Sequence, residues 1–350
     1  MTTISVTLAI IVGGIAILNA VLFWFMPRLT RRDLYFAVTV APGFRDEPEG
    51  KSMLRRYRTE LVIGCIAAFI VFVAGFAWFG IKFAPAGILI QVAASFIAFY
   101  RARQRALPSA VPPTTIREAE LRNHDWIIPG GWIAAAGPFI LLAAFAAYLW
   151  IHGADLWRSV GPSGRTAAHA LGAYIISTAG ILTAFSLMLY GLAHWVRPVY
   201  AVGPGRMREL KFRRTASAVI LLTEYLLAIQ GSWIMLTRGH AGITVALLPV
   251  FLVILLIAVV FLARLGQGGN RIPVAHEEPA SASTSIPVGD RTLDRYWKLG
   301  IFYFNRDDST VIVEKRFGVG YSLNFARPMA WIVIFLLLFS ALIPFLAHFV

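Results

Sequence analysis

The sequence predicts an all-α membrane protein with about eight transmembrane helices and a small cytoplasmic three-stranded β-meander before the last helix. Of its 350 residues, 58% are hydrophobic and only 14% are charged, and the mean hydropathy is +0.70. These values are more apolar than a soluble globular surface allows. Eight apolar stretches approach the ~20 residues that cross a bilayer. The basic residues are concentrated in alternate loops between these stretches, as in multi-pass membrane proteins.

Each predicted span is an apolar run between more polar segments. The spans cover residues 4–26, 60–80, 84–100, 129–151, 168–196, 215–237, 241–263 and 328–350. The first run lacks the basic start of a signal peptide, so we expect it to be a retained helix. The second and third spans are so close in sequence that the chain must reverse tightly, and a helix break at Pro85 fits this turn.

The basic residues predict the orientation of these spans. The loops 27–59, 101–128, 197–214 and 264–327 hold 28 of the 32 lysines and arginines, and the opposite set of segments holds 4. Short loops rich in lysine and arginine are retained in the cytoplasm, so we expect both termini on the exterior side. The net charge of +14 therefore reflects the basic residues that set the orientation of the spans in the membrane. We expect the lipid bilayer, and no nucleic acid, as a partner, because no aromatic-interleaved basic stripe or nucleic-acid-binding motif accompanies the arginines.

Four segments are predicted along the chain. Residues 1–263 form a seven-helix transmembrane region, 264–290 a disordered linker, 291–327 a small cytoplasmic β module, and 328–350 the last helix. The linker is rich in Pro, Ser, Ala and Gly, as in EEPASASTSIPVGD, and cannot bury a core. In the module, three runs with strand character are separated by turn residues. These runs are Leu299 to Phe304, Thr310 to Lys315 and Tyr321 to Phe325.

The first basic loop has two interpretations. Leu34, Phe36, Val38 and Val40 alternate at the period of a strand. The loop is either an ordered element against the membrane, with Arg55, Arg56 and Arg58 facing anionic lipid, or a basic loop that only sets topology.

The tail contains a specific motif. Its residues are Arg295, Trp297, Lys298, Gly300, Phe302, Tyr303, Asn305, Asp307, Asp308, Val313, Lys315, Arg316, Gly318, Gly320, Asn324, Phe325 and Pro328. This pattern resembles a domain of unknown function (number 5808 type) that precedes the last helix of uncharacterised bacterial multi-pass membrane proteins. RRDLYFAVTV in the first loop also resembles these proteins, which are distantly similar to SdpI-type immunity and signalling membrane proteins (domain of unknown function 1648 type). The resemblance implies a bacterial inner-membrane location and a role in immunity, sensing or sequestration.

No motif for catalysis or metal binding is present. Cys65 is the only cysteine, and the seven histidines are far apart without an HExxH pair. No nucleophile, base and oxyanion donor can be assembled from adjacent loops. We therefore expect no enzyme activity, no metal and no cofactor.

The strongest intramembrane candidate is Glu224, the only acidic residue deep within a span. An ionised carboxylate at such a depth costs about 2.5–3.5 kcal/mol on insertion scales, so the side chain should face protein. Gln91 and Asn19 lie at similar depth, and we expect the three to meet in a polar cluster. This cluster would either join helices or form a proton or ion relay.

Two functions follow from these features. The first is a non-enzymatic binding, immunity or signalling component, whose tail forms a docking surface for a cytoplasmic protein. The predicted docking residues are Trp297, Gly300, Tyr303, Asn305, Asp307, Lys315, Arg316, Gly318 and Asn324. The alternative is a small-solute or proton-coupled transporter that uses Glu224.

Overall fold

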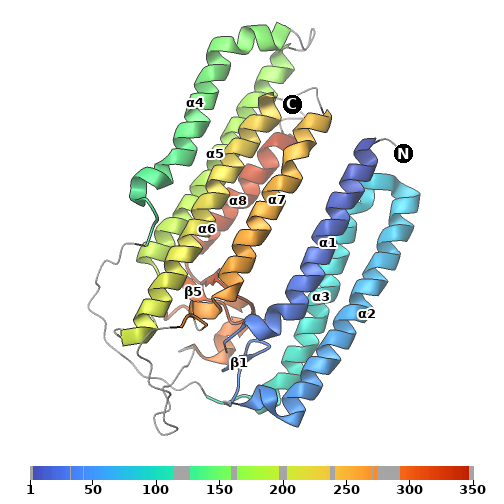
Figure 1. Cartoon of the computed structure of the whole chain (residues 1–350), viewed down its shortest axis with the longest axis vertical. Coiled ribbons are helices and arrows are strands. Elements are labelled where there is room, and N and C mark those ends of the chain that lie inside the picture. Colours follow the sequence, from blue (N-terminus) through green and yellow to red (C-terminus); the bar gives the residue numbers. More distant parts are fainter. Residues whose placement is uncertain are drawn as a thin grey trace. The chain divides into compact units, whose positions relative to one another are not determined.

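The computed structural model describes residues 3–31, 33–41, 43–112, 127–158, 164–196, 203–236, 241–269, 271–273 and 292–346. The chain divides into two units, whose helices are labelled in Figure 1. Unit 1 contains Met1–Glu120, Ala263–Asn305 and Glu314–Ser322, and unit 2 contains Leu121–Leu262, Arg306–Val313 and Leu323–Val350. Most of the predicted linker, residues 274–290, lies outside the described residues.

The described residues of unit 1 include three α-helices. α1 covers Thr3–Leu29, α2 covers Pro48–Phe79 and α3 covers Ala84–Ala106. α3 packs along α2 and also contacts α1. α2 and α3 are joined by a short 3-10 turn, Gly80–Phe83, after which a proline occupies the first turn of α3. Proline suits this position because its missing amide N–H has no helical acceptor there.

Unit 2 contains the other α-helices of the described part of the chain. They are α4 (Gly131–Arg158), α5 (Gly164–His194), α6 (Gly203–Leu236), α7 (Ala241–Arg264, of which the last two residues belong to unit 1) and α8 (Pro328–Leu346). α5 packs against α8 and α6, and α4 packs against α6 and α5. Small residues allow the close approach of α5 and α8, since Ser177 donates a 2.6 Å hydrogen bond to the carbonyl oxygen of Ser340.

Six helices in the described part of the chain are long and apolar enough to cross a membrane. They lie in α2 to α7, and two further apolar helices, Gly13–Leu29 and Pro328–Ile343, are shorter. The mainly helical membrane fold is therefore supported, while eight spans remain a prediction. α2 begins at Pro48 and α6 at Gly203, well before the predicted starts at 60 and 215. Hydropathy marks where apolar sequence begins, whereas lysine and arginine also favour helix and can extend it beyond that point.

The strands differ from the predicted meander. Among the described residues, β3 (Trp297–Lys298) pairs with β4 (Phe302–Tyr303), and β5 (Ile312–Glu314) pairs with β6 (Tyr321–Leu323), as two separate two-stranded sheets. The predicted three-stranded meander is thus wrong. Leu299 and Gly300 have φ of 54° and 80°, so the chain turns inside the predicted first strand. Positive φ at two successive residues is typical of a type I′ hairpin turn.

The first loop is also an ordered hairpin in unit 1. β1 (Leu34–Tyr35) and β2 (Val38–Thr39) pair antiparallel, with Leu34 opposite Thr39 and Tyr35 opposite Val38. Its two turn residues, Phe36 and Ala37, have φ of 47° and 62° and are fully buried. Non-glycine residues rarely adopt this conformation, which costs roughly 1–2 kcal/mol per residue. The alternation from Leu34 to Val40 predicts strand character, which the structure has, but it gives no indication of the turn at Phe36 and Ala37.

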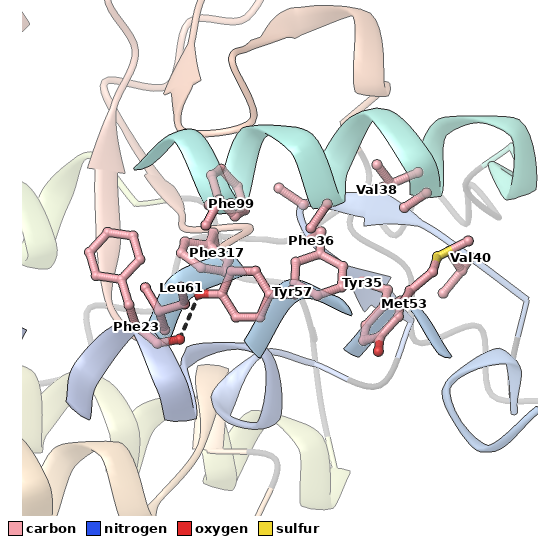
Figure 2. Packing of buried hydrophobic residues seen from close by; sticks show 14 of the residues in the cluster. Phe23, Tyr35, Phe36, Val38, Val40, Met53, Tyr57, Leu61, Phe99 and Phe317 are labelled. Carbon is pink, nitrogen blue, oxygen red and sulfur yellow. Dashed lines mark hydrogen bonds between the residues drawn. The ribbon is translucent and has the colours of Figure 1, made fainter. Parts of the chain in front are cut away.

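The core of unit 1 joins this hairpin to the helices and to the tail (Figure 2). Phe317 comes from residues 314–322 of the tail, and its ring lies 3.8 Å from that of Phe99 in α3 and 6.0 Å from that of Phe23 in α1. Tyr57 of α2 donates a 2.7 Å hydrogen bond to the carbonyl oxygen of Phe23. Segments that are nearly three hundred residues apart in sequence thus share one core.

Candidate functional site

The most elaborate polar structure in unit 1 lies where the two hairpins meet the end of α3. We call it the hairpin cluster, and it consists of residues 30–31 and 33–40, Arg103, Gln267, residues 292–304 and residues 314–322. Its three buried arginines, Arg31, Arg103 and Arg316, are held by contacts between segments that are distant in sequence.

Arg103 joins the two hairpin turns. Its guanidinium donates hydrogen bonds to the carbonyl oxygen of Ala37 in the first turn and, at 3.4 Å, to that of Trp297 in β3. Gly300 lies against the same arginine, because a Cβ at this position would be 2.9 Å from the Arg103 Cδ and 3.1 Å from the Ala37 Cβ. Position 300 therefore requires glycine for two reasons: its φ of +80° is unfavourable for other residues, and the space that a side chain would need is already filled.

Asp294 joins three segments through one carboxylate. The Thr39 hydroxyl donates a 2.9 Å hydrogen bond to Asp294 Oδ1, and Arg316 forms an ion pair with the same oxygen. Arg316 is fully buried, donates to the carbonyl oxygen of Thr292 and lies with its guanidinium carbon 5.5 Å from the centre of the Trp297 ring. Trp297 in turn donates a 2.8 Å hydrogen bond to the Thr292 hydroxyl. A buried charge is stable only when it is paired and hydrogen-bonded in this way.

A second ion-pair group fixes the start of the first loop. Arg31 contacts Glu314 of β5 at 3.0 Å and Asp33 at 3.2 Å. Arg45 donates to the Thr30 hydroxyl at 2.7 Å and to backbone carbonyls of the loop. Burial raises the pKa of the neighbouring Tyr35 phenol to about 12, so it stays a neutral donor to the carbonyl oxygen of Gly50 at 2.8 Å. These contacts explain why the loop is ordered.

Gln267, just after α7, closes the cluster from another direction. Its amide nitrogen donates to the carbonyl oxygen of Gly320 at 2.8 Å, and its amide oxygen accepts from the backbone N–H of Gly320 at 2.7 Å. Ser322 donates a 3.3 Å hydrogen bond to the carbonyl oxygen of Ile301, which ties the tail to the β3–β4 hairpin. The beginning of the predicted linker is therefore part of the folded cluster.

Most of the predicted docking residues are buried. They are Trp297, Gly300, Tyr303, Arg316, Gly318 and Asn324, whereas Asn305 is half-buried and only Asp307 and Lys315 are exposed. Asn324, in unit 2, donates 3.1 Å hydrogen bonds to the carbonyl oxygens of Asp308 and Thr310. Most of the predicted docking residues therefore build the fold, and other residues of the tail form its outer surface.

That outer surface is partly apolar. Leu299 at the tip of the β3–β4 hairpin is 57% exposed, and Phe302 and Phe304 are 41% and 37% exposed. Arg295 and Lys298 are exposed on the same hairpin segment. We call these five residues the hairpin patch. Sequence reasoning missed it, although the alternation around the buried Tyr303 was a usable signal.

The predicted intramembrane residues lie in different units. In unit 2, Glu224 of α6 is fully buried and accepts a 3.0 Å hydrogen bond from Ser186 of α5. Its second carboxylate oxygen has no hydrogen-bond partner among the described residues. In unit 1, the Asn19 amide donates to Ser95 at 3.3 Å, and the Gln91 amide donates to the carbonyl oxygen of Ala16 at 2.7 Å. The meeting of Glu224 with these two amides stays a prediction.

Comparison with known proteins finds a family that matches one short segment of the chain. A family of unknown function (DUF5808) matches residues 306–331, which run from the turn before β5 into α8. No curated protein and no solved structure matches the chain. The chain thus contains a segment similar to an uncharacterised domain and several helices able to span a membrane.

Proposed function

We propose that this protein is a non-enzymatic, multi-pass protein of the bacterial inner membrane that acts by binding a soluble cytoplasmic protein. In this proposal the chain has eight spans with both termini on the exterior side, which places the basic loops and the hairpin cluster in the cytoplasm. The distribution of lysine and arginine supports this orientation. The tail and the first loop resemble uncharacterised multi-pass membrane proteins that are distantly similar to SdpI-type proteins, and this resemblance favours a role in immunity or signalling.

The observation that carries the proposal is the hairpin patch. Exposed apolar side chains that gather on one surface are typical of interaction sites. Here they stand on a short hairpin whose backbone is held by Arg103, by Ser322 and by the turn at Gly300. A surface that is already ordered loses little conformational entropy on binding. The fold thus presents a preformed contact surface.

The chemistry of the patch defines the partner. Leu299, Phe302 and Phe304 would contact apolar side chains, while Arg295 and Lys298 would pair with carboxylates. An amphipathic protein segment with aspartate or glutamate beside its apolar face meets both requirements.

A photo-crosslinking amino acid at position 299 tests this proposal in intact cells. We expect one major crosslinked protein, and its yield should fall about tenfold or more when Phe302→Ser and Lys298→Glu are added, because interface centres carry most of the binding energy. The same crosslinker at Leu107, which is also exposed in unit 1, is the matched control. Equal crosslinking from both positions, or no effect of the two substitutions, would refute a docking role.

Removal of the whole module is a poorer experiment. Deleting residues 291–327 would take Phe317 out of the unit 1 core and leave the Arg31 side chain without Glu314. Loss of binding would then reflect loss of folding, whereas substitutions at exposed positions leave these contacts intact.

A second function, a proton-coupled or small-solute transporter, is favoured by Glu224. Its fully buried carboxylate has one oxygen without a partner among the described residues, and such groups within a span are often proton or ion sites. Proteoliposomes that enclose a pH-sensitive dye should show proton flux that is lost with Glu224→Gln. Equal flux in the variant, with unchanged protein content, would eliminate this candidate.

A further inference from the structure

A groove in unit 1 between α1 and α2 is separate from the hairpin patch. It has a volume of about 640 Å³ and is open to its surroundings. Lys51, Arg55 and Arg58 line it from α2, and Trp24 lines it from α1. Positions 51, 55 and 58 are spaced by four and three residues, so they share one face of the helix. None of the residues that line the groove is acidic.

The Arg58 side chain is preorganised to bind an anion. Its guanidinium carbon lies 4.6 Å from the centre of the Trp24 ring, which fixes the plane of the group. Its Nε and Nη2 atoms are shielded from solvent and donate to no acceptor in the described part of the chain. Arg28 of α1 adds a repulsive positive charge nearby. An anion in the groove, beside the partly exposed Arg58 side chain, would offset the positive charge and reduce this repulsion.

The groove changes character along α2. Beyond the basic residues it is lined by Val62 and Ile63, which are 44% and 60% exposed and lie at the start of the apolar part of a helix long enough to cross a membrane. From Arg58 to Ile63 the helix rises roughly 7.5 Å. A tryptophan between the charged and apolar parts is typical of the membrane interface. This sequence of charged, aromatic and apolar residues matches a phospholipid, with its phosphate first and its acyl chain beyond.

We propose that this groove binds the headgroup phosphate of an anionic phospholipid, with the acyl chain along Val62 and Ile63. The phosphate belongs to a lipid, because a free phosphate would make no contact with the apolar half of the groove. Arg56, which is exposed on the same helix but does not line the groove, takes no part in this site. The site is independent of the proposed protein docking, since it shares no residue with the hairpin patch.

Native mass spectrometry of the full-length protein, released from detergent, tests the site. The probes are dioleoylphosphatidylglycerol, dioleoylphosphatidylcholine and inorganic phosphate. We expect tighter binding of phosphatidylglycerol than of phosphatidylcholine. Arg55→Gln combined with Arg58→Gln should weaken phosphatidylglycerol binding about 30-fold, since a basic residue near anionic lipid contributes roughly fivefold in affinity. Arg56→Gln, which removes the same kind of charge, should change it by less than about twofold.

Several results would overturn the assignment. They are an equal loss with Arg56→Gln, equal binding of phosphatidylcholine, and inorganic phosphate that displaces the lipid at stoichiometric occupancy. If the double variant does not fold, Lys51→Gln replaces it, because Lys51 is exposed near the start of α2 and its loss leaves the Trp24–Arg58 contact intact. The expected loss for Lys51→Gln is about fivefold, and an unchanged affinity would refute the site.

Discussion

Arg316 in unit 1 and Glu224 in unit 2 are both fully buried charged residues, but their surroundings differ. Arg316 has Asp294, the Thr292 carbonyl and the Trp297 ring as partners. Glu224 has a hydrogen bond from Ser186 to one oxygen, while its other oxygen has no partner among the described residues. The Arg316 guanidinium thus has three kinds of contact, whereas only one of the two Glu224 carboxylate oxygens accepts a hydrogen bond from a described residue.

This difference separates a structural charge from a functional candidate. A buried arginine with a complete set of partners holds the segments that supply them, here the first loop and the tail. A buried carboxylate with an unsatisfied oxygen costs free energy without joining additional segments, and such a cost calls for an explanation. Substitutions at Arg316 and Glu224 test this contrast, and substitutions at Gly300 and Ala37 test the contact between the two hairpin turns.

Arg316→Met should have the largest effect. The substitution leaves the Asp294 carboxylate without its main partner, and removing one member of a buried ion pair typically lowers the free energy of unfolding by about 3–5 kcal/mol. Chemical unfolding in detergent, followed by circular dichroism, measures this change. Adding Asp294→Asn should recover part of the loss, because no unpaired charge then remains. Arg295→Met, at an exposed position, should change stability by less than about 0.5 kcal/mol. Equal effects of Arg316→Met and Arg295→Met would contradict the structural role.

Gly300→Ala should have the second-largest effect on stability. A side chain there has an unfavourable φ of +80° and also meets Ala37 and Arg103, so we expect a loss of about 2–3 kcal/mol. Gly43→Ala is the control, because Gly43 has φ of +90° but nothing within 4 Å of its Cβ position. The control should cost only about 1 kcal/mol. If both variants lost the same amount, contact between the two turns would not matter.

Glu224→Gln should change stability by less than about 1 kcal/mol, because glutamine still accepts from Ser186 and a neutral amide is easier to bury than a carboxylate. Ser186→Ala, which removes the donor, should be the more damaging of the two, at about 1–3 kcal/mol. Thermal unfolding of both variants in detergent tests this order. The reverse order would show that the charge of Glu224 is structural, as that of Arg316 is.

Ala37→Gly should have the smallest effect and the opposite sign. Its φ of 62° is strained for alanine, at roughly 1–2 kcal/mol, whereas glycine loses about 0.5–1 kcal/mol through chain entropy. We expect a net stabilisation of about 0.5 kcal/mol, measured by the same unfolding experiment. A clear loss of stability would show that the Ala37 Cβ contributes more by packing than its backbone conformation costs.

Helices were the most predictable part of this protein. Long apolar runs around α2 to α7 identified helices that can cross a membrane, because the length needed for a span is set by the bilayer. The first loop and the tail were recognised as regions with strand character. Their hairpin turns were not, since Phe36 and Ala37 carry no local signal for positive φ and adopt it only within a packed core.

The residues of the candidate sites are likewise visible in the sequence, whereas their arrangement is not. Lys51, Arg55, Arg58 and Trp24 are visible in the sequence, but only the packing of α1 against α2 places them around one groove. The predicted docking residues of the tail suggested a contact surface, yet burial assigns most of them to the interior and leaves Leu299, Phe302 and Phe304 outside. The sequence alone determined the apolar helices and the distribution of basic loops, because both depend on local composition. Tertiary structure decided which charges are paired and which side chains are exposed, because Arg316, Asp294 and Thr39 meet only after distant segments have packed together.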